Sequence, residues 1–185
     1  YFPSHTLSGE IPDNKPMPLD KVMRYSRDMA TGMTVAHQAG VIHRDLKPAN
    51  VLVNDEGLLK IVDFGVAAAA SSGDTQLTKT GYVIGSPKYM APEQILGKKV
   101  DETADIYSVG VIMYEMVTGI PPYSRGDHMS VMYQHVQGKA KQCQEINPDI
   151  PDAFAAIINK SMSVDKTKRY QSMAELTEAL DAIDM

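Results

Sequence analysis

Four side chains near the start of the sequence have types and spacings suited to phosphoryl transfer. Asp45, Lys47 and Asn50 lie within the run His43–Asn50, and Asp63 follows thirteen residues after Asn50. A carboxylate can accept a hydroxyl proton, a lysine can neutralise phosphate charge, and amide and carboxylate oxygens can hold a metal ion. The set therefore indicates phosphoryl transfer, although each acid or amide taken alone is more often a turn or helix-cap residue.

Three multi-residue motifs follow one another in the order used by eukaryotic-type protein kinases: the His43–Asn50 run, Asp63–Gly65 and Ala91–Glu93. Agreement in sequence, order and spacing is far more specific than one short motif. The chain resembles the C-terminal lobe of a protein serine/threonine kinase of the bacterial kind, over nearly its whole length. The resemblance implies an α+β, protein-kinase-like fold: a mainly helical large lobe with a small β-hairpin, without the N-terminal lobe.

The resemblance assigns a role to each of the four side chains. Asp45 is expected to be the catalytic base, which orients the substrate hydroxyl and accepts its proton, and Lys47 to neutralise charge on the transferred group. Asn50 and Asp63 are expected to hold Mg²⁺ and, with it, the phosphates of ATP, because Mg²⁺ prefers oxygen ligands. Lys47 is also typical of serine/threonine kinases, so the expected partners are protein substrates with Ser or Thr hydroxyls.

Two further positions are expected to contact the adenine of ATP. Leu52 resembles the apolar floor beneath the base, and the backbone at Phe2 would face the adenine edge. Residues 1–18, which contain four prolines, would be the connector that follows the interlobe hinge.

The nucleotide site is expected to be incomplete in these 185 residues. The sequence contains no Gly-x-Gly-x-x-Gly loop, and the lysine and glutamate of the small lobe would precede Tyr1. Those parts cover and hold the ATP phosphates. We therefore expect a missing N-terminal kinase lobe as an essential partner, and negligible activity from this fragment alone.

Residues 63–93 would form the activation segment. Within it, Thr78 and Thr80 are the best candidate phosphorylation sites, and Arg44 would pair with the phosphate. A phosphate adds about two negative charges and three acceptor oxygens, so it can order a loop by binding arginine. Unmodified surface hydroxyls remain the alternative at both threonines.

Five residues resemble structural members of the lobe. Glu93 and Arg169 match a buried ion pair, and Asp105 matches the carboxylate that braces the catalytic loop. His43 and Phe64 match members of an apolar spine, so His43 is not expected to act as an acid or base.

Composition and charge fit a single globular domain. Hydrophobic residues make up 43% of the chain and charged residues 22%, close to the globular average. The net charge of −5 argues against a nucleic-acid partner, and a single cysteine, Cys143, cannot form an internal disulfide. The most apolar stretch, 104–117, is shorter than the about 20 residues that span a bilayer. We expect a cytoplasmic location, either free or as the cytoplasmic part of a membrane-anchored kinase.

The elements that must position these residues follow from periodicity and turn signals. Apolar residues at helical spacing predict a helix over 19–38, and two β-prone runs, 51–53 and 58–62, predict a hairpin. A central buried helix is expected over 103–118. Further helices are expected over 127–137, from Pro151 onward and after Ser172, and a short one near Leu7.

Two other functions stay open. A pseudokinase or kinase-like interaction module would keep the shape without the chemistry, but pseudokinases commonly lose one of the four side chains that are all present here. A small-molecule kinase of related fold is disfavoured, because such enzymes resemble His-Gly-Asp and lack the Ala-Pro-Glu motif.

Overall fold

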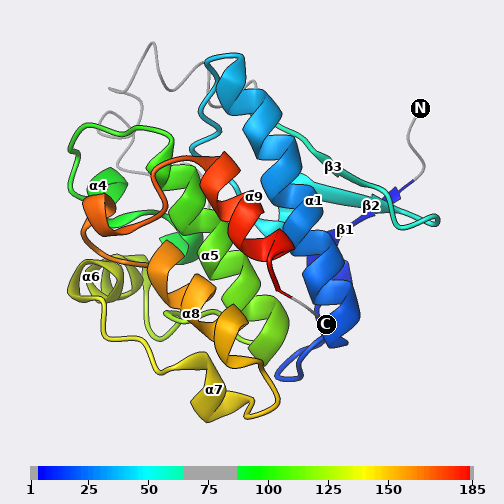
Figure 1. The fold of residues 1–185 in the computed structure, drawn as a ribbon. Coiled ribbons are helices and arrows are strands. Elements are labelled where there is room, and N and C mark those ends of the chain that lie inside the picture. The colour runs from blue at the N-terminus through cyan, green and yellow to red at the C-terminus, as the bar shows by residue number, and fades with distance from the viewer. Residues whose placement is uncertain (1–3, 65–86, 184–185) are drawn as a thin grey trace.

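A computed structural model describes residues 4–64 and 87–183, and Figure 1 shows helices packed around a central helix with a small sheet at one side. The described chain contains these helices: α1 (Leu19–Gln38), α4 (Pro92–Ile95), α5 (Thr103–Thr118), α6 (His128–Gln137), α7 (Cys143–Ile146), α8 (Asp152–Ser161) and α9 (Met173–Asp181). Short 3-10 turns lie at Leu7–Gly9, Pro48–Asn50, Pro87–Tyr89 and Lys166–Lys168. The helices predicted over 19–38 and 103–118 are confirmed with those bounds.

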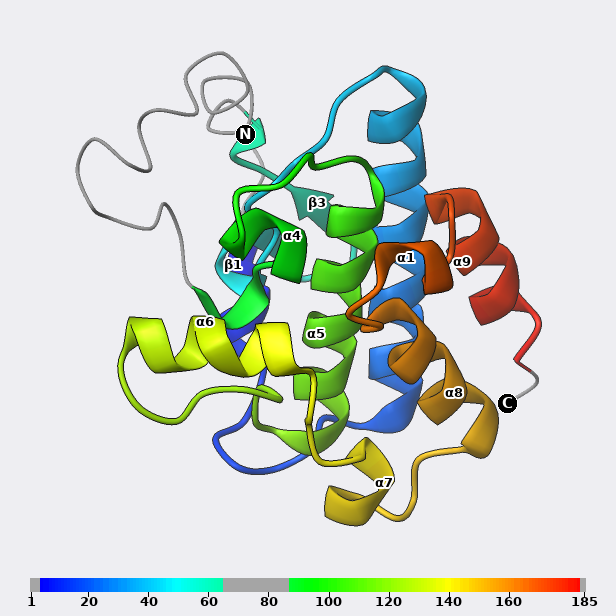
Figure 2. The same ribbon diagram turned by 90° about the vertical axis from the view of Figure 1, so that its left-hand side faces the viewer.

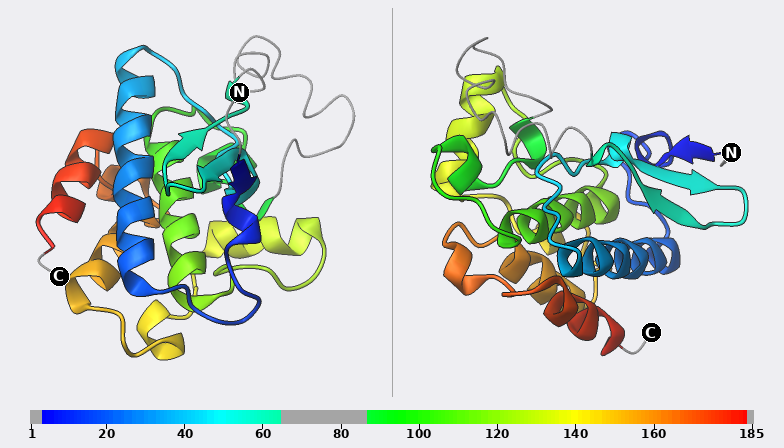
Figure 3. Two further views of the ribbon diagram at one scale, coloured as in Figure 1. Left: turned by 90° about the vertical axis from the view of Figure 1, so that its right-hand side faces the viewer. Right: turned by 90° about the horizontal axis from the view of Figure 1, so that it is seen from above.

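The sheet has three antiparallel strands in the order β1-β2-β3: β1 (Ser4–Thr6), β2 (Val51–Asn54) and β3 (Leu59–Ile61). The predicted hairpin is confirmed as β2 and β3. Strand β1 was not predicted, because its sequence shows no apolar alternation and it forms only by pairing with β2. Seen from above in Figure 3, the strands lie at one side of the helices and α4 and α6 at the other.

Helix α5 is the centre of the core, and Figure 2 shows it running through the middle of the helical body. Every residue of α5 is buried except Glu115, which is half-buried. The neighbouring helix α8 approaches closely at Gly110, where an added Cβ would lie 2.8 Å from the Cβ of Ser161. A helix that is apolar on nearly all sides is a buried core helix, as predicted from its sequence. In the part of the chain that is described, no helix combines the length and apolarity needed to cross a bilayer.

Local signals fix where the helices begin and end. The Asp127 side chain accepts a hydrogen bond from the Ser130 N–H, and the Ser172 hydroxyl accepts one from the Glu175 N–H. Ser172 and Glu175 have the spacing of a capping box, but only half of it forms, because the Glu175 carboxylate accepts from the Gln171 N–H and not from the Ser172 N–H. Helix α5 ends at Gly119, whose φ of 86° is readily adopted only by glycine.

Candidate active site

The loop that joins α1 to β2 holds three of the four predicted side chains. It ends in the Pro48–Asn50 turn, where the Asn50 N–H donates to the Lys47 carbonyl at 2.9 Å. The Asn50 side chain is buried, and its Nδ2 donates to the Asp45 carbonyl at 2.8 Å. Lys47 Nζ lies 3.6 Å from Asp45 Oδ2. The structure therefore brings acid, cation and amide together in one loop.

Asp63 is brought beside this loop through its neighbour Val62. The Val62 N–H donates to the Asn50 carbonyl at 2.9 Å, and the Val62 carbonyl accepts from His43 Nε2 at 2.8 Å. Asp63 itself is exposed and has φ of 68°, a left-handed conformation that is uncommon outside glycine. Such conformations persist where the surroundings enforce them, often at functional sites. Arg44, with φ of 71°, is a second example within the same site.

The Asp105 carboxylate, in the first turn of α5, accepts hydrogen bonds that hold the loop in place. Its Oδ2 accepts from the His43 N–H at 2.8 Å and from His37 Nε2 at 2.9 Å, and its Oδ1 accepts from the Arg44 N–H at 3.0 Å. Asp105 is 1% exposed, and a buried carboxylate is stable only when its oxygens are satisfied in this way. Sequence reasoning missed His37; a polar residue in the last turn of α1, just before the loop, was the available signal.

His43 uses both ring nitrogens inside the protein. Nε2 donates to the Val62 carbonyl and Nδ1 accepts from the Asp45 N–H at 3.2 Å. The ring is fully buried and lies 4.6 Å from the Phe64 ring, centroid to centroid. These two hydrogen bonds tie the loop to the backbone segment that precedes Asp63.

Burial raises the pKa of the Asp45 carboxyl above its ordinary value, against the opposing effects of Lys47, His43 and the Asn50 side chain. Partial removal from water disfavours the charged form of any carboxylate. A raised pKa makes Asp45 a better proton acceptor than an exposed aspartate, and Lys47 keeps the carboxylate form accessible.

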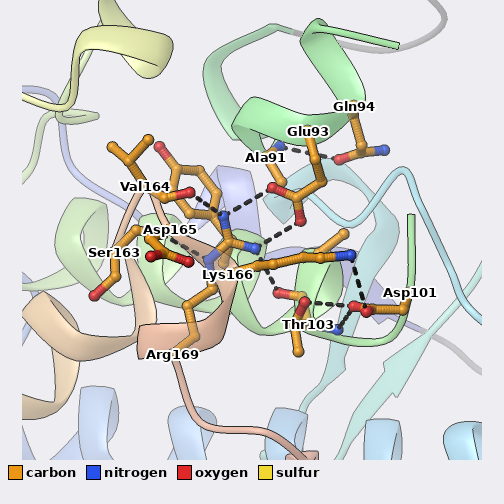
Figure 4. A network of polar contacts seen from close by, with 12 residues as sticks. Ala91, Glu93, Gln94, Asp101, Thr103, Ser163, Val164, Asp165, Lys166 and Arg169 are labelled. Carbon is orange, nitrogen blue, oxygen red and sulfur yellow. Dashed lines mark hydrogen bonds and ion pairs between the residues drawn. The ribbon is translucent and has the colours of Figure 1, made fainter. Parts of the chain in front are cut away.

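Glu93 and Arg169 form a buried, bidentate ion pair, shown in Figure 4. The two N–O distances are 2.7 and 2.8 Å, and Arg169 is 2% exposed. The remaining guanidinium donors bind the carbonyls of Thr103, Ser163 and Val164. All five N–H donors of Arg169 are therefore satisfied, which ties α4 to the start of α5 and to the segment after α8.

Gln94, the residue after Glu93, was also missed from the sequence. Its Nε2 donates to the Arg44 carbonyl at 2.8 Å, although the two residues are 50 positions apart. This contact joins α4 directly to the loop that carries Asp45.

Leu52 lies on the sheet face that points away from the helices. Its neighbours Val51 and Val53 are buried in the core, whereas Leu52 is half-buried. Side chains alternate between the two faces of a strand, so Leu52 is available to a group bound beside the sheet. Phe2, Thr78 and Thr80 lie outside the described residues.

No cluster of three or more His, Cys, Asp or Glu side chains suited to a metal occurs among the described residues. A Mg²⁺ site does not require such a cluster, because this ion usually takes one or two carboxylates together with substrate phosphates. Asn50 Nδ2 donates to the Asp45 carbonyl, and within the described part of the chain no hydrogen bond to its Oδ1 is seen.

Residues 1–180 match the family described as "Protein kinase domain". A probable serine/threonine-protein kinase of Clostridium acetobutylicum is 36% identical over 183 residues, which are 99% of this chain and 28% of that protein. The serine/threonine-protein kinase PknB of Mycobacterium leprae is 35% identical over 176 residues, 95% of this chain and 28% of that protein. The chain thus spans about a quarter of the length of such curated relatives. With the motifs in their expected order and a family match over almost its whole length, this chain belongs to the protein kinase domain family.

Proposed function

We propose that this chain carries the phosphoryl-transfer centre of a protein serine/threonine kinase. The reaction moves the γ-phosphoryl group of ATP to a Ser or Thr hydroxyl of a protein. The observation that carries the proposal is that Asp45, Lys47 and Asn50 contact one another within one loop. Val62, the neighbour of Asp63, is hydrogen-bonded to Asn50 of that loop. The names of the bacterial relatives support the Ser/Thr class.

In this proposal Asp45 orients the substrate hydroxyl and accepts its proton as the oxygen bonds to phosphorus. Lys47, 3.6 Å from Asp45, neutralises negative charge on the transferred group, whose charge spreads over its oxygens. Asn50 Oδ1 and the Asp63 carboxylate would hold Mg²⁺. When bound, the ion neutralises charge on the phosphate oxygens and orients them.

Membership of the kinase family supports the following roles for the remaining parts of the site. Leu52 would lie beneath the adenine and the backbone at Phe2 beside it. Residues 43–50 are the catalytic loop and 63–93 the activation segment, in which a phosphate on Thr78 or Thr80 would pair with Arg44. The chain would then be a C-terminal lobe that works with an N-terminal lobe containing the Gly-rich loop, and the 185 residues alone would have negligible activity.

The test compares the natural full-length protein with its Asp45→Asn variant for transfer of labelled phosphate from ATP to a protein substrate. The variant keeps the size and the hydrogen-bonding shape but cannot accept the proton. We expect a loss of at least about 100-fold, within the range attributed to a positioned base. Equal label transfer by both proteins would reject Asp45 as base, and no transfer by either would favour the interaction-module alternative.

A further inference from the structure

The side chain of Gln94 makes two hydrogen bonds that fix its orientation. Its Oε1 accepts from the Ala91 N–H at 3.0 Å, a contact drawn in Figure 4, and its Nε2 donates to the Arg44 carbonyl at 2.8 Å. One partner is a donor and the other an acceptor, so an amide is the group that satisfies both.

The Arg44 carbonyl belongs to the peptide unit that immediately precedes Asp45. That unit is planar, so its C=O and the Asp45 N–H turn together. The N–H edge is held by His43 Nδ1 at 3.2 Å and the C=O edge by Gln94 at 2.8 Å. The plane that sets the backbone of Asp45 is therefore held at both edges.

Arg44 needs these constraints, because its φ of 71° is uncommon for a residue with a side chain. Its N–H is held by Asp105 of α5 and its C=O by Gln94 of α4. His43 accepts from the Asp45 N–H and Asp105 from the Arg44 N–H. Among the described residues, Gln94 is the side chain that donates to the Arg44 carbonyl.

We propose that Gln94 is a positioning residue for phosphoryl transfer: its amide holds the Arg44–Asp45 peptide unit and thereby sets the direction of the Asp45 carboxylate. The inference rests on the proposed function of Asp45 as base. Gln94 follows Glu93, whose ion pair with Arg169 anchors α4. The Gln94 side chain therefore connects the anchored helix α4 to the backbone of Asp45.

The decisive variant is Gln94→Glu. It is nearly isosteric and keeps an oxygen for the Ala91 N–H, but it replaces the donor to the Arg44 carbonyl with an oxygen that repels it. We expect kcat of the natural full-length protein to fall about tenfold to hundredfold, as small misplacements of reacting groups do, with KM for ATP changed less than about threefold. The matched control is Gln137→Glu on α6, an exposed glutamine that bonds the Tyr133 hydroxyl, and it should leave kcat unchanged.

A pH profile separates positioning from general damage. When the new carboxyl of Gln94→Glu is protonated it regains a donor, so the ratio of its kcat to that of wild type should rise as the pH is lowered. The ratio of the two kcat values is used because Asp45 titrates in both proteins. A kcat within about twofold of wild type, or a ratio that does not change with pH, would overturn the proposal.

Folding is checked by thermal unfolding of each variant. If Gln94→Glu is unfolded at the assay temperature, Gln94→Met takes its place; it should lose a similar fraction of kcat without recovery at low pH, and wild-type kcat would reject the inference. An active wild type and an inactive Asp45→Asn protein, together with fully active Gln94 variants, would refute this inference alone. An inactive wild type would instead refute the proposed function.

Discussion

Breaking the buried Glu93–Arg169 pair from one side should destabilise the fold strongly. In Glu93→Gln the guanidinium stays almost fully buried and keeps three carbonyl partners, but its charge is no longer compensated. Removing one partner of a buried pair costs about 3–5 kcal/mol. For a domain of this size about 1 kcal/mol shifts Tm by about 2–4 °C, so a fall of about 6–20 °C is expected.

The assay is a double-mutant cycle on thermal and urea unfolding, with Glu93→Gln, Arg169→Met and the double variant. The double variant should lose less free energy of unfolding than the sum of the two single variants, because it leaves no charge unpaired. We expect a coupling energy of about 2 kcal/mol or more. Asp181→Asn is the matched control, because Asp181 forms an ion pair with Arg27 at 3.7 Å but its side chain is 63% exposed. This variant should lose no more than about 1 kcal/mol of unfolding free energy. A cost below about 1 kcal/mol for Glu93→Gln, or strict additivity, would refute this reasoning.

Three further outcomes are expected. Asp105→Asn should lower kcat of the full-length protein at least about tenfold, since an amide places a donor against one of the three groups that now donate to it; unchanged kcat would contradict the bracing role. Gly119→Ala should destabilise the chain by about 1–3 kcal/mol or more in urea unfolding, because φ is 86° and the added Cβ would lie 2.2 Å from the Lys15 nitrogen. Burial lowers the pKa of His135 from 6.5 to about 4, so the unfolded chain binds more protons between these values. Stability should then fall by about 3 kcal/mol as the pH drops from 6.5 to 4, and His135→Phe should reduce that slope, which unfolding at several pH values would show.

The longest elements could be predicted from local signals. Helix α1 is bounded by Pro18 and Gly40, and its apolar stripe has helical spacing, so both ends were visible in the sequence. Helix α5 is apolar on nearly all sides and ends at Gly119. Such signals depend only on neighbours in the chain, which is why these predictions succeeded.

Short elements and tertiary hydrogen bonds could not be predicted in the same way. Strand β1 has three residues and forms through its pairing with β2, and α4 and α7 have four residues each, too few for a periodic pattern. The contact from Gln94 reaches a backbone carbonyl, and a carbonyl leaves no trace in the sequence because every residue has one. The expectations for Asp105 and for Glu93 with Arg169 came from the family resemblance, not from any local pattern.

The most direct test of the central claim is a crystal structure of the natural full-length protein with Mg²⁺ and a non-hydrolysable ATP analogue. We predict the metal bound by Asn50 Oδ1 and the Asp63 carboxylate, at about 2.0–2.1 Å, with Lys47 at the terminal phosphate and Asp45 facing it. Phosphates and metal bound away from these four side chains, or Asp45 turned from the terminal phosphate, would contradict the assignment of this site.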